Sequence, residues 1–231
     1  MCSDTRFVID PAGQVAPCPS CGAVDYAAQS GLSGDELATT ADSITGKEAI
    51  HRMLRWLVGE MVERPTGWIT LWGSYGTAKT LAVQAMVAGL VRKGVQARFY
   101  HAKRLEQGWF DDIHGDSSNG HMYRRLRVLA IDEADKINTK SDWTRAAFQE
   151  LMDDRYRSGL AGKTCTIIVT QHDPEQCMPG DVASRMADGR FYRAWKYKAN
   201  SFTIERWGDL WVPGIMRVQG QDMRPQMRPK M

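Results

Sequence analysis

"GSYGTAKT", residues 73–80, predicts more about the fold of this chain than any other stretch of it. It meets the pattern G-x-x-x-x-G-K-[ST] at Gly73, Lys79 and Thr80, and departs from it only at Ala78, where the pattern has glycine. In such a loop the backbone N–H groups converge on phosphate oxygens, and the helix that follows points its positive end at them. The lysine then reaches the β- and γ-phosphates, and the hydroxyl after it ligates Mg²⁺.

The flanking residues support this interpretation. "WITLW" (68–72) has the composition of a short buried strand, and "TLAVQAMVAGLVRK" (80–93) predicts an apolar helix. An alanine methyl group at position 78 is harmless if φ is negative there, and costs about 1 kcal/mol or more if φ is positive. We expect a working site in which all eight loop residues contact nucleotide: Gly73, Ser74, Tyr75, Gly76, Thr77, Ala78, Lys79 and Thr80.

An acidic pair follows a second buried strand. "RVLAIDEAD" (127–135) brings Asp132 to the carboxyl end of an apolar run, where its carboxylate can hold Mg²⁺ through water. Glu133, the next residue, is then placed to orient and deprotonate an attacking water. An acidic pair could instead cap a turn, but the phosphate-loop pattern some 50 residues earlier favours a site that hydrolyses a nucleoside triphosphate.

Strands and helices alternate along the chain. Strand-forming segments are "WITLW", "VQARFYH" (95–101), the run ending at Asp132, and "CTIIVT" (165–170), with "RFYRAWKY" (190–197) a candidate fifth. Helices are expected at 43–63, 80–93, 103–113 and 143–158, the last with Trp143, Ala147, Phe148, Leu151 and Met152 on one side. Continuously apolar strands that alternate with helices indicate an α/β protein whose parallel sheet is covered on both faces.

Two further segments carry polar side chains near the predicted site. The strand "TIIVTQH" ends in Thr170, Gln171 and His172, any of which could sense the γ-phosphate or position water, or simply begin a loop. Arg185, in "GDVASRMADGR", could stabilise transition-state charge on a phosphate bound by a neighbouring subunit. A surface ion pair is the alternative for this arginine.

Composition limits the function classes. The 231 residues are 43% hydrophobic and 25% charged, as in an ordinary globular domain. No apolar run approaches the roughly 18 residues of a membrane span, and no secretory pattern opens the sequence. Five cysteines without regular spacing fit a reducing compartment, so we expect a cytoplasmic protein. The net charge of +3 permits nucleic-acid binding without requiring it.

The order of the motifs resembles that of the AAA+ ATPases, and more closely that of the DnaC/IstB group of helicase loaders and transposition helpers. "LAIDEAD", "FQELMDDRYRSGLAGKTCTIIVTQH" and "GDVASRM" carry the likeness, which covers roughly residues 45–205. It implies a P-loop NTPase three-layer sandwich with sheet order 5-1-4-3-2, little or no helical lid, and ATP with Mg²⁺ as ligands. It also implies a homo-oligomer (ring, spiral or filament) in which Arg185 acts on a neighbour's nucleotide. Ala78 and the "TQH" ending depart from the family pattern.

The resemblance leaves three functions open. The first is a loader that delivers a replicative helicase to DNA, and the second is a transposition helper that binds DNA and recruits a transposase. The third is a nucleotide-gated protein adaptor that does not bind DNA. "DEAD" at 132–135 raises a DEAD-box RNA helicase as a rival, but such enzymes need two lobes and a Ser-Ala-Thr motif that is absent. On charge alone, the DNA-binding candidates are Lys103, Arg104, Arg124 and Arg125.

The two ends of the chain differ from its centre in composition. We expect a flexible N-terminal arm over 1–42, the ATPase domain over 43–212, and a basic, disordered tail over 213–231. Within the arm, Cys18 and Cys21 have the spacing of half a zinc site, with Cys2 as a third ligand. A closed tetrahedral site needs a fourth ligand, so an arm without zinc is the favoured alternative.

Overall fold

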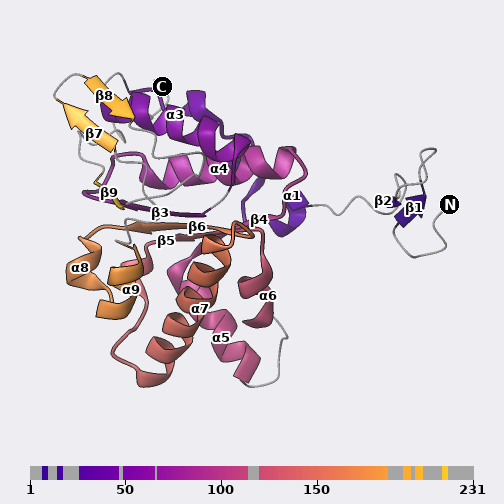
Figure 1. The fold of residues 1–231 in the computed structure, drawn as a ribbon, viewed down its shortest axis with the longest axis vertical. Coiled ribbons are helices and arrows are strands. Elements are labelled where there is room, and N and C mark those ends of the chain that lie inside the picture. The colour runs from indigo at the N-terminus through magenta and orange to yellow at the C-terminus, as the bar shows by residue number, and fades with distance from the viewer. Residues whose placement is uncertain are drawn as a thin grey trace.

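The computed structural model describes residues 7–9, 15–17, 26–46, 49–65, 67–113, 120–186, 195–198, 201–204 and 215–217. Most of these residues form three layers, with a central sheet between two layers of helices (Figure 1). In the described ranges, no helix combines the length and the apolar character needed to cross a membrane.

The central sheet has five parallel strands. Along the chain they are β3 (Gly67–Trp72), β4 (Ala97–His101), β5 (Val128–Asp132), β6 (Cys165–Thr170) and β9 (Ile215–Arg217). They lie side by side in the order β4-β5-β6-β3-β9, which is the expected order 5-1-4-3-2 read from the other edge. β5 and β6 are buried along their whole length, as strands covered on both faces must be.

The fifth strand comes from a different segment than expected. In "RFYRAWKY", the described residues belong to β7 (Trp195–Lys198), which pairs antiparallel with β8 (Ser201–Ile204) instead of joining the central sheet. The position of the fifth strand is taken by β9, which lies in the segment predicted to be a disordered tail. Local composition shows that a segment favours a strand, but it does not identify the partner strand. An antiparallel partner is available through a short connection, whereas a parallel one needs a long crossover.

Two hydrophobic clusters hold the helices to the sheet. On one face lie α3 (Ala49–Glu63) and α4 (Lys79–Arg92), and the apolar side chains of Leu54, Leu57, Val58 and Met61 on α3 are buried there. The other face is covered by α5 (Ala102–Ile113), α6 (Gly120–Arg125), α7 (Asp142–Leu160), α8 (Pro174–Cys177) and α9 (Gly180–Met186). Trp143, which we placed on the buried side of its helix, is 37% exposed and contacts Phe110 of α5.

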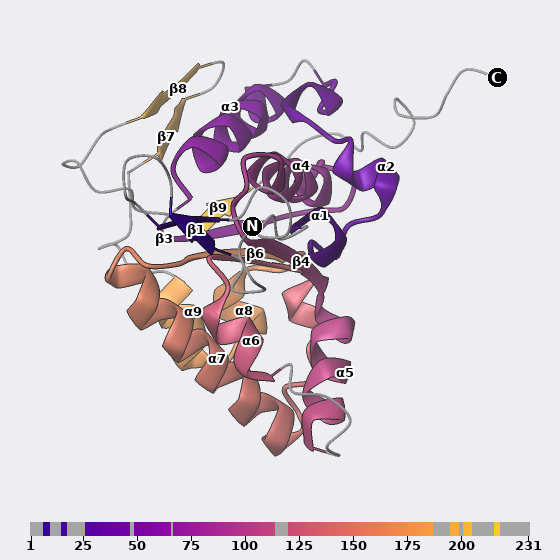
Figure 2. The same cartoon turned by 90° about the vertical axis from the view of Figure 1, so that its right-hand side faces the viewer.

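Residues 26–42, expected to belong to a flexible arm over 1–42, are folded against α4. They form α1 (Tyr26–Gln29), α2 (Gly34–Leu37) and the 3-10 turn η1 (Ala41–Ser43) beside α4 (Figure 2). Leu32 and Leu37 pack on the cluster beneath α4, and Arg92 of α4 donates to the Leu37 carbonyl at 2.6 Å. These elements are too short to show helical periodicity, so the sequence pattern alone did not reveal them.

Ahead of this segment, β1 (Phe7–Ile9) pairs antiparallel with β2 (Val15–Pro17). The three cysteines considered for zinc, at positions 2, 18 and 21, lie outside the described residues.

Candidate functional site

The loop between β3 and α4 carries the predicted phosphate-binding residues. Gly73 and Gly76 have positive φ values of 142° and 74°, which glycine adopts without a steric cost. Lys79 begins α4, and its Nζ donates to the backbone carbonyls of Gly73 at 2.8 Å and Ser74 at 2.7 Å. Burial lowers the pKa of Lys79, while the nearby carboxylates of Asp132 and Asp135 act in the opposite direction. The two hydrogen bonds to backbone carbonyls therefore hold the Lys79 ammonium group against the loop.

Ala78 adopts the left-handed conformation that the sequence pattern reserves for glycine. Its φ is 64° and its ψ is 18°, at the residue immediately before α4. Of the two cases weighed for this alanine, the structure shows the costly one, so the methyl group strains the loop by about 1 kcal/mol or more. Gly73 and Gly76 also have positive φ, so the backbone of the loop adopts positive φ at three of its eight residues.

The two motifs of the predicted site meet in space. Thr80 Oγ1 donates to Asp132 Oδ2 at 3.0 Å, although 52 positions separate the two residues. Asp132 is 2% exposed at the end of β5, and burial raises its pKa while the Thr80 hydrogen bond acts against that rise. A hydroxyl and a carboxylate are the hard oxygen ligands that suit Mg²⁺, which commonly takes one or two protein groups together with phosphate oxygens and water. These residues fit the metal that the motif implies.

His101 is a neighbour of this pair that the sequence analysis missed. Its Nδ1 lies 3.6 Å from Asp132 Oδ2, because the last residue of β4 is in register with the last residue of β5. The sequence could have indicated this contact, because the segments of β4 and β5 were expected to be neighbours and the carboxyl ends of parallel strands lie at one edge of a sheet.

Glu133 lies beside Asp132 with φ at 55°, in the left-handed region. Its carboxylate pairs with Lys136 Nζ at 2.5 Å, in the turn η2 (Ala134–Lys136) that follows β5. Glu133 and Asp132 both line a cavity of about 300 Å³ next to the phosphate-binding loop. The Glu133 carboxylate therefore lies at the candidate site and is partly exposed to solvent.

The three sensor candidates at the end of β6 differ in their contacts. Thr170 Oγ1 donates to the carbonyl of His172 at 2.8 Å, and His172 is exposed. The backbone N–H of Gln171 donates to Asp135 Oδ2 at 3.2 Å, which ties the end of β6 to the acidic loop. The Gln171 side chain lines the cavity, and within the described ranges its buried Nε2 has no hydrogen-bond partner. Gln171 therefore has a donor still available for a ligand.

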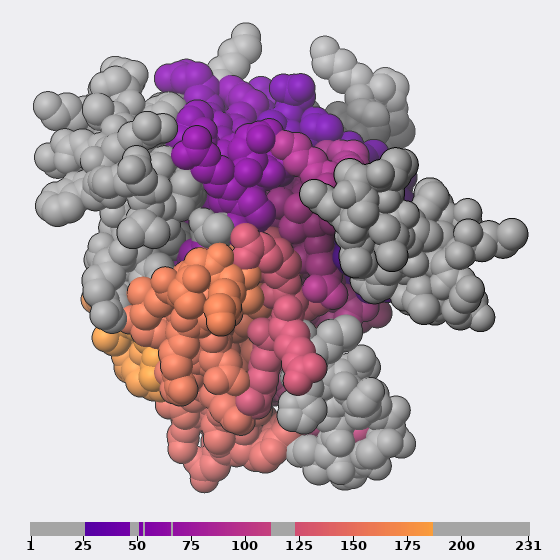
Figure 3. Space-filling view, turned by 45° about the vertical axis from the view of Figure 1, so that its right-hand side comes forward, coloured from indigo at the N-terminus to yellow at the C-terminus, as the bar shows by residue number. Residues whose placement is uncertain are grey.

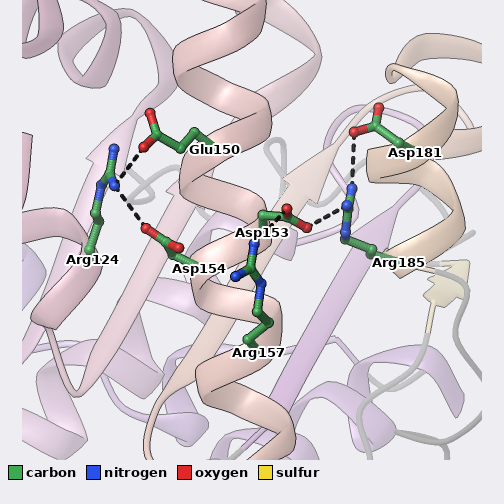
Figure 4. Close-up of polar contacts among 7 residues, drawn as sticks. All are labelled: Arg124, Glu150, Asp153, Asp154, Arg157, Asp181 and Arg185. Carbon is green, nitrogen blue, oxygen red and sulfur yellow. Dashed lines mark hydrogen bonds and ion pairs between the residues drawn. The ribbon is translucent and has the colours of Figure 1, made fainter.

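Arg185 on α9 is paired within its own chain. Its guanidinium contacts Asp181, at 3.0 Å, and Asp153 of α7 (Figure 4). The guanidinium carbon also lies 6.0 Å from the centroid of the Tyr156 ring. This is the ion-pair alternative considered for Arg185, and a role toward a neighbouring subunit stays a prediction. The space-filling view shows α7 at the molecular surface with α9 beside it (Figure 3).

The four DNA-binding candidates also differ in their surroundings. Arg124 donates to Glu150 and Asp154 of α7, both at 2.9 Å, so two carboxylates offset its charge (Figure 4). Lys103 pairs with Glu106 at 2.8 Å, whereas Arg104 and Arg125 are exposed. Among the four, Arg104 and Arg125 have no acidic partner in the described part of the chain and are best placed to meet a phosphate backbone.

Comparisons with known proteins bear on the fold. No protein-family model matches the chain, and no curated protein matches its sequence. Among solved structures, a DnaC helicase loader is 18% identical with a TM-score of 0.56, over 66% of this chain and 94% of that one. DnaI is 13% identical with a TM-score of 0.58, over 84% of this chain and 94% of that one.

AMPPCP-bound DnaA from Aquifex aeolicus is 21% identical with a TM-score of 0.54, over 63% of this chain. The chain spans less than half of that protein, 46% of its length. These similarities confirm the predicted P-loop fold of the AAA+ type and, at the level of the fold, the resemblance to the DnaC group.

Proposed function

We propose that this protein binds and hydrolyses ATP with Mg²⁺, and that it uses the nucleotide to load a replicative helicase onto DNA. The observation that supports the chemistry best is the hydrogen bond between Thr80 and Asp132, which unites the phosphate-loop motif and the acidic motif in one site. Bound Mg²⁺ would neutralise phosphate charge there, held by those two side chains.

The remaining groups have distinct roles in this proposal. Lys79 and the N–H groups of the loop bind the phosphates, and Glu133 orients and deprotonates the attacking water. For Glu133 to do so, its carboxylate must leave Lys136, an exchange that costs little because exposed pairs of this kind contribute about 0–1 kcal/mol. Gln171 offers its available amide N–H₂ to the terminal phosphate, which favours it over Thr170 and His172 as the sensor.

The proposed biological role rests on structural similarity and on surface charge. The similar structures include DnaC, described as a helicase loader, and DnaA bound to AMPPCP and single-stranded DNA. Arg104 and Arg125 are exposed on α5 and α6, where they can contact phosphate groups. We therefore propose DNA and a replicative helicase as partners, and a homo-oligomer as the active form.

The test is ATP turnover with and without single-stranded DNA. We expect Lys79→Ala to abolish ATP binding, and Glu133→Gln to retain binding but lose at least about 100-fold in turnover, as removal of a general base does. DNA should stimulate the wild type. Tight ATP binding without DNA stimulation would favour the adaptor function, and no binding at millimolar ATP would refute the proposal.

A mixing experiment tests the role of Arg185 between subunits. Arg185→Ala should lower turnover, and adding the Lys79→Ala protein should restore part of it, because that variant supplies the missing arginine to its neighbour. Unchanged turnover in Arg185→Ala would show that the ion pairs with Asp153 and Asp181 are the whole function of this side chain.

A further inference from the structure

The folded N-terminal segment reaches the candidate nucleotide site through one side-chain contact. Gln84 lies on α4 one helical turn after Leu81, and both residues line the 300 Å³ cavity. Gln84 Nε2 donates to Glu36 Oε1 of α2 at 2.6 Å, across 48 positions of sequence. Glu36 and Gln84 are both half-buried.

This contact fixes which end of the Gln84 amide faces Glu36. An ionised carboxylate accepts hydrogen bonds and donates none, so the amide nitrogen must face it. The second oxygen of Glu36, Oε2, accepts from the backbone N–H of Ser33 at 2.7 Å, which holds the carboxylate in place as part of a capping box. Gln84 makes no other side-chain hydrogen bond to the described residues, so its oxygen is left to accept from a ligand.

The residues that line the cavity differ in chemistry. Asp132, Glu133 and Gln171 lie at or just beyond the carboxyl ends of β5 and β6, where the metal and the attacking water belong. On α4, beyond the phosphate-binding residues Lys79 and Thr80, the lining residues are Leu81 and Gln84. With the phosphates bound by the loop, the flat and largely apolar base belongs beside Leu81. Gln84 is the polar side chain of α4 that is left to meet it.

We propose that Gln84, oriented by Glu36, selects an adenine base over guanine. This inference rests on the proposed nucleotide binding and identifies the base that the site accepts. The exocyclic amino group of adenine donates a hydrogen bond, whereas guanine presents a carbonyl oxygen at the equivalent position. The outward oxygen of Gln84 pairs with the first and opposes the second, and a buried polar group left without a partner is a strong basis for discrimination.

The Glu36→Gln substitution tests the inference because it should reverse the amide. The new glutamine can keep its oxygen on the Ser33 N–H, since Gln also serves in a capping box, and it then turns its N–H₂ toward Gln84. The amide oxygen of Gln84 must then accept a hydrogen bond from that N–H₂, so the amide of Gln84 turns over and directs its own N–H₂ at the base. By calorimetry with Mg²⁺, we expect the ratio of ADP to GDP affinity to fall about tenfold, the effect of one mismatched hydrogen bond.

Two further variants separate this effect from a general loosening of α2. Gln84→Leu removes the acceptor, so ADP affinity should fall about tenfold while GDP affinity does not fall. Ser33→Ala removes the hydroxyl that accepts from the Glu36 N–H and leaves the contact between Glu36 and Gln84 intact, so the affinity ratio should be unchanged.

The outcomes distinguish this inference from the proposed function. A wild-type protein that prefers ADP, with a lower preference in Glu36→Gln, supports the assignment. A wild type that binds ADP and GDP equally, or an unchanged ratio in Glu36→Gln, overturns the assignment while nucleotide binding stands. A wild type that binds neither nucleotide overturns the proposed function and the assignment with it.

Discussion

Replacing Ala78 with glycine should stabilise the protein, although the change removes a side chain. At φ 64° and ψ 18° the alanine is in the left-handed region, where a side chain costs roughly 1–2 kcal/mol. Glycine removes this strain but gives the unfolded chain more conformational freedom, which offsets about 0.4–1 kcal/mol. We therefore expect the free energy of unfolding of Ala78→Gly to rise by about 0.5–1 kcal/mol.

Gly94 provides the matched control at the other end of the same helix. Its φ is 74°, and a Cβ built there has no atom within 4 Å, so Gly94→Ala changes the backbone preference without creating a clash. The strain of an alanine at positive φ, less the entropy that alanine removes from the unfolded chain, predicts that Gly94→Ala loses about 0.5–1 kcal/mol of unfolding free energy. Urea unfolding at neutral pH measures both changes, and the melting temperatures should move in opposite directions by about 1–4 °C.

If Ala78 is strained, Ala78→Gly and Gly94→Ala must change the free energy of unfolding in opposite directions. If Ala78→Gly lowered the free energy of unfolding as Gly94→Ala does, Ala78 would not adopt the left-handed conformation and the strain argument would be wrong. ADP affinity should change less than about threefold in Ala78→Gly, because the backbone path of the loop stays the same and a change below 0.7 kcal/mol corresponds to that factor.

Three other predictions follow from buried and exposed charges. Burial raises the pKa of Asp132, so its charge destabilises the folded state at neutral pH, and this penalty disappears as the pH falls through the raised pKa. The free energy of unfolding of Asp132→Asn should therefore exceed that of the wild type by about 1 kcal/mol at pH 7, and this difference should disappear near pH 3. The same variant should not bind Mg²⁺–ATP. Arg155 is fully buried, with its pKa lowered by burial to about 10, and it donates to two backbone carbonyls and a threonine hydroxyl. Arg155→Met should lose about 3 kcal/mol of unfolding free energy by leaving these acceptors unpaired, whereas the exposed Arg157→Met should lose under about 0.5 kcal/mol; equal losses would contradict this. Arg125→Ala should weaken single-stranded DNA binding and reduce its salt slope by about 1, measured by fluorescence anisotropy, while Arg124→Ala should leave that slope unchanged because two carboxylates already offset its charge.

Much of the candidate site could be predicted from short segments. The phosphate loop and the acidic pair each combine an apolar strand with polar residues at its end, and both properties are local. Their meeting at Thr80 and Asp132 followed from the parallel sheet, which aligns the carboxyl ends of its strands at one edge. The strand order was also expected, through the resemblance to a known family.

The partners of individual side chains were not predictable in the same way. The sequence made Arg124 a DNA-binding candidate and left Arg185 between a role toward a neighbouring subunit and a surface ion pair. In the structure Arg124 pairs with Asp154 of α7, and Arg185 pairs with Asp153 of α7 and with Asp181 of its own helix. The contact between Glu36 and Gln84 joins a segment without periodicity to the middle of a helix. Such contacts depend on how distant elements pack, and no local pattern encodes that.

The sequence alone determined the phosphate loop at residues 73–80 and the acidic motif at residues 127–135. A turn, a strand end and a helix start are formed by neighbours in sequence, so their residues could be identified without the tertiary structure. Folding determined which strand became the fifth in the sheet, whether Ala78 was strained, and that residues 26–43 pack on α4 at the candidate nucleotide site. These outcomes depend on contacts between segments far apart in the chain, and the free energy of those contacts exists only once the core has formed.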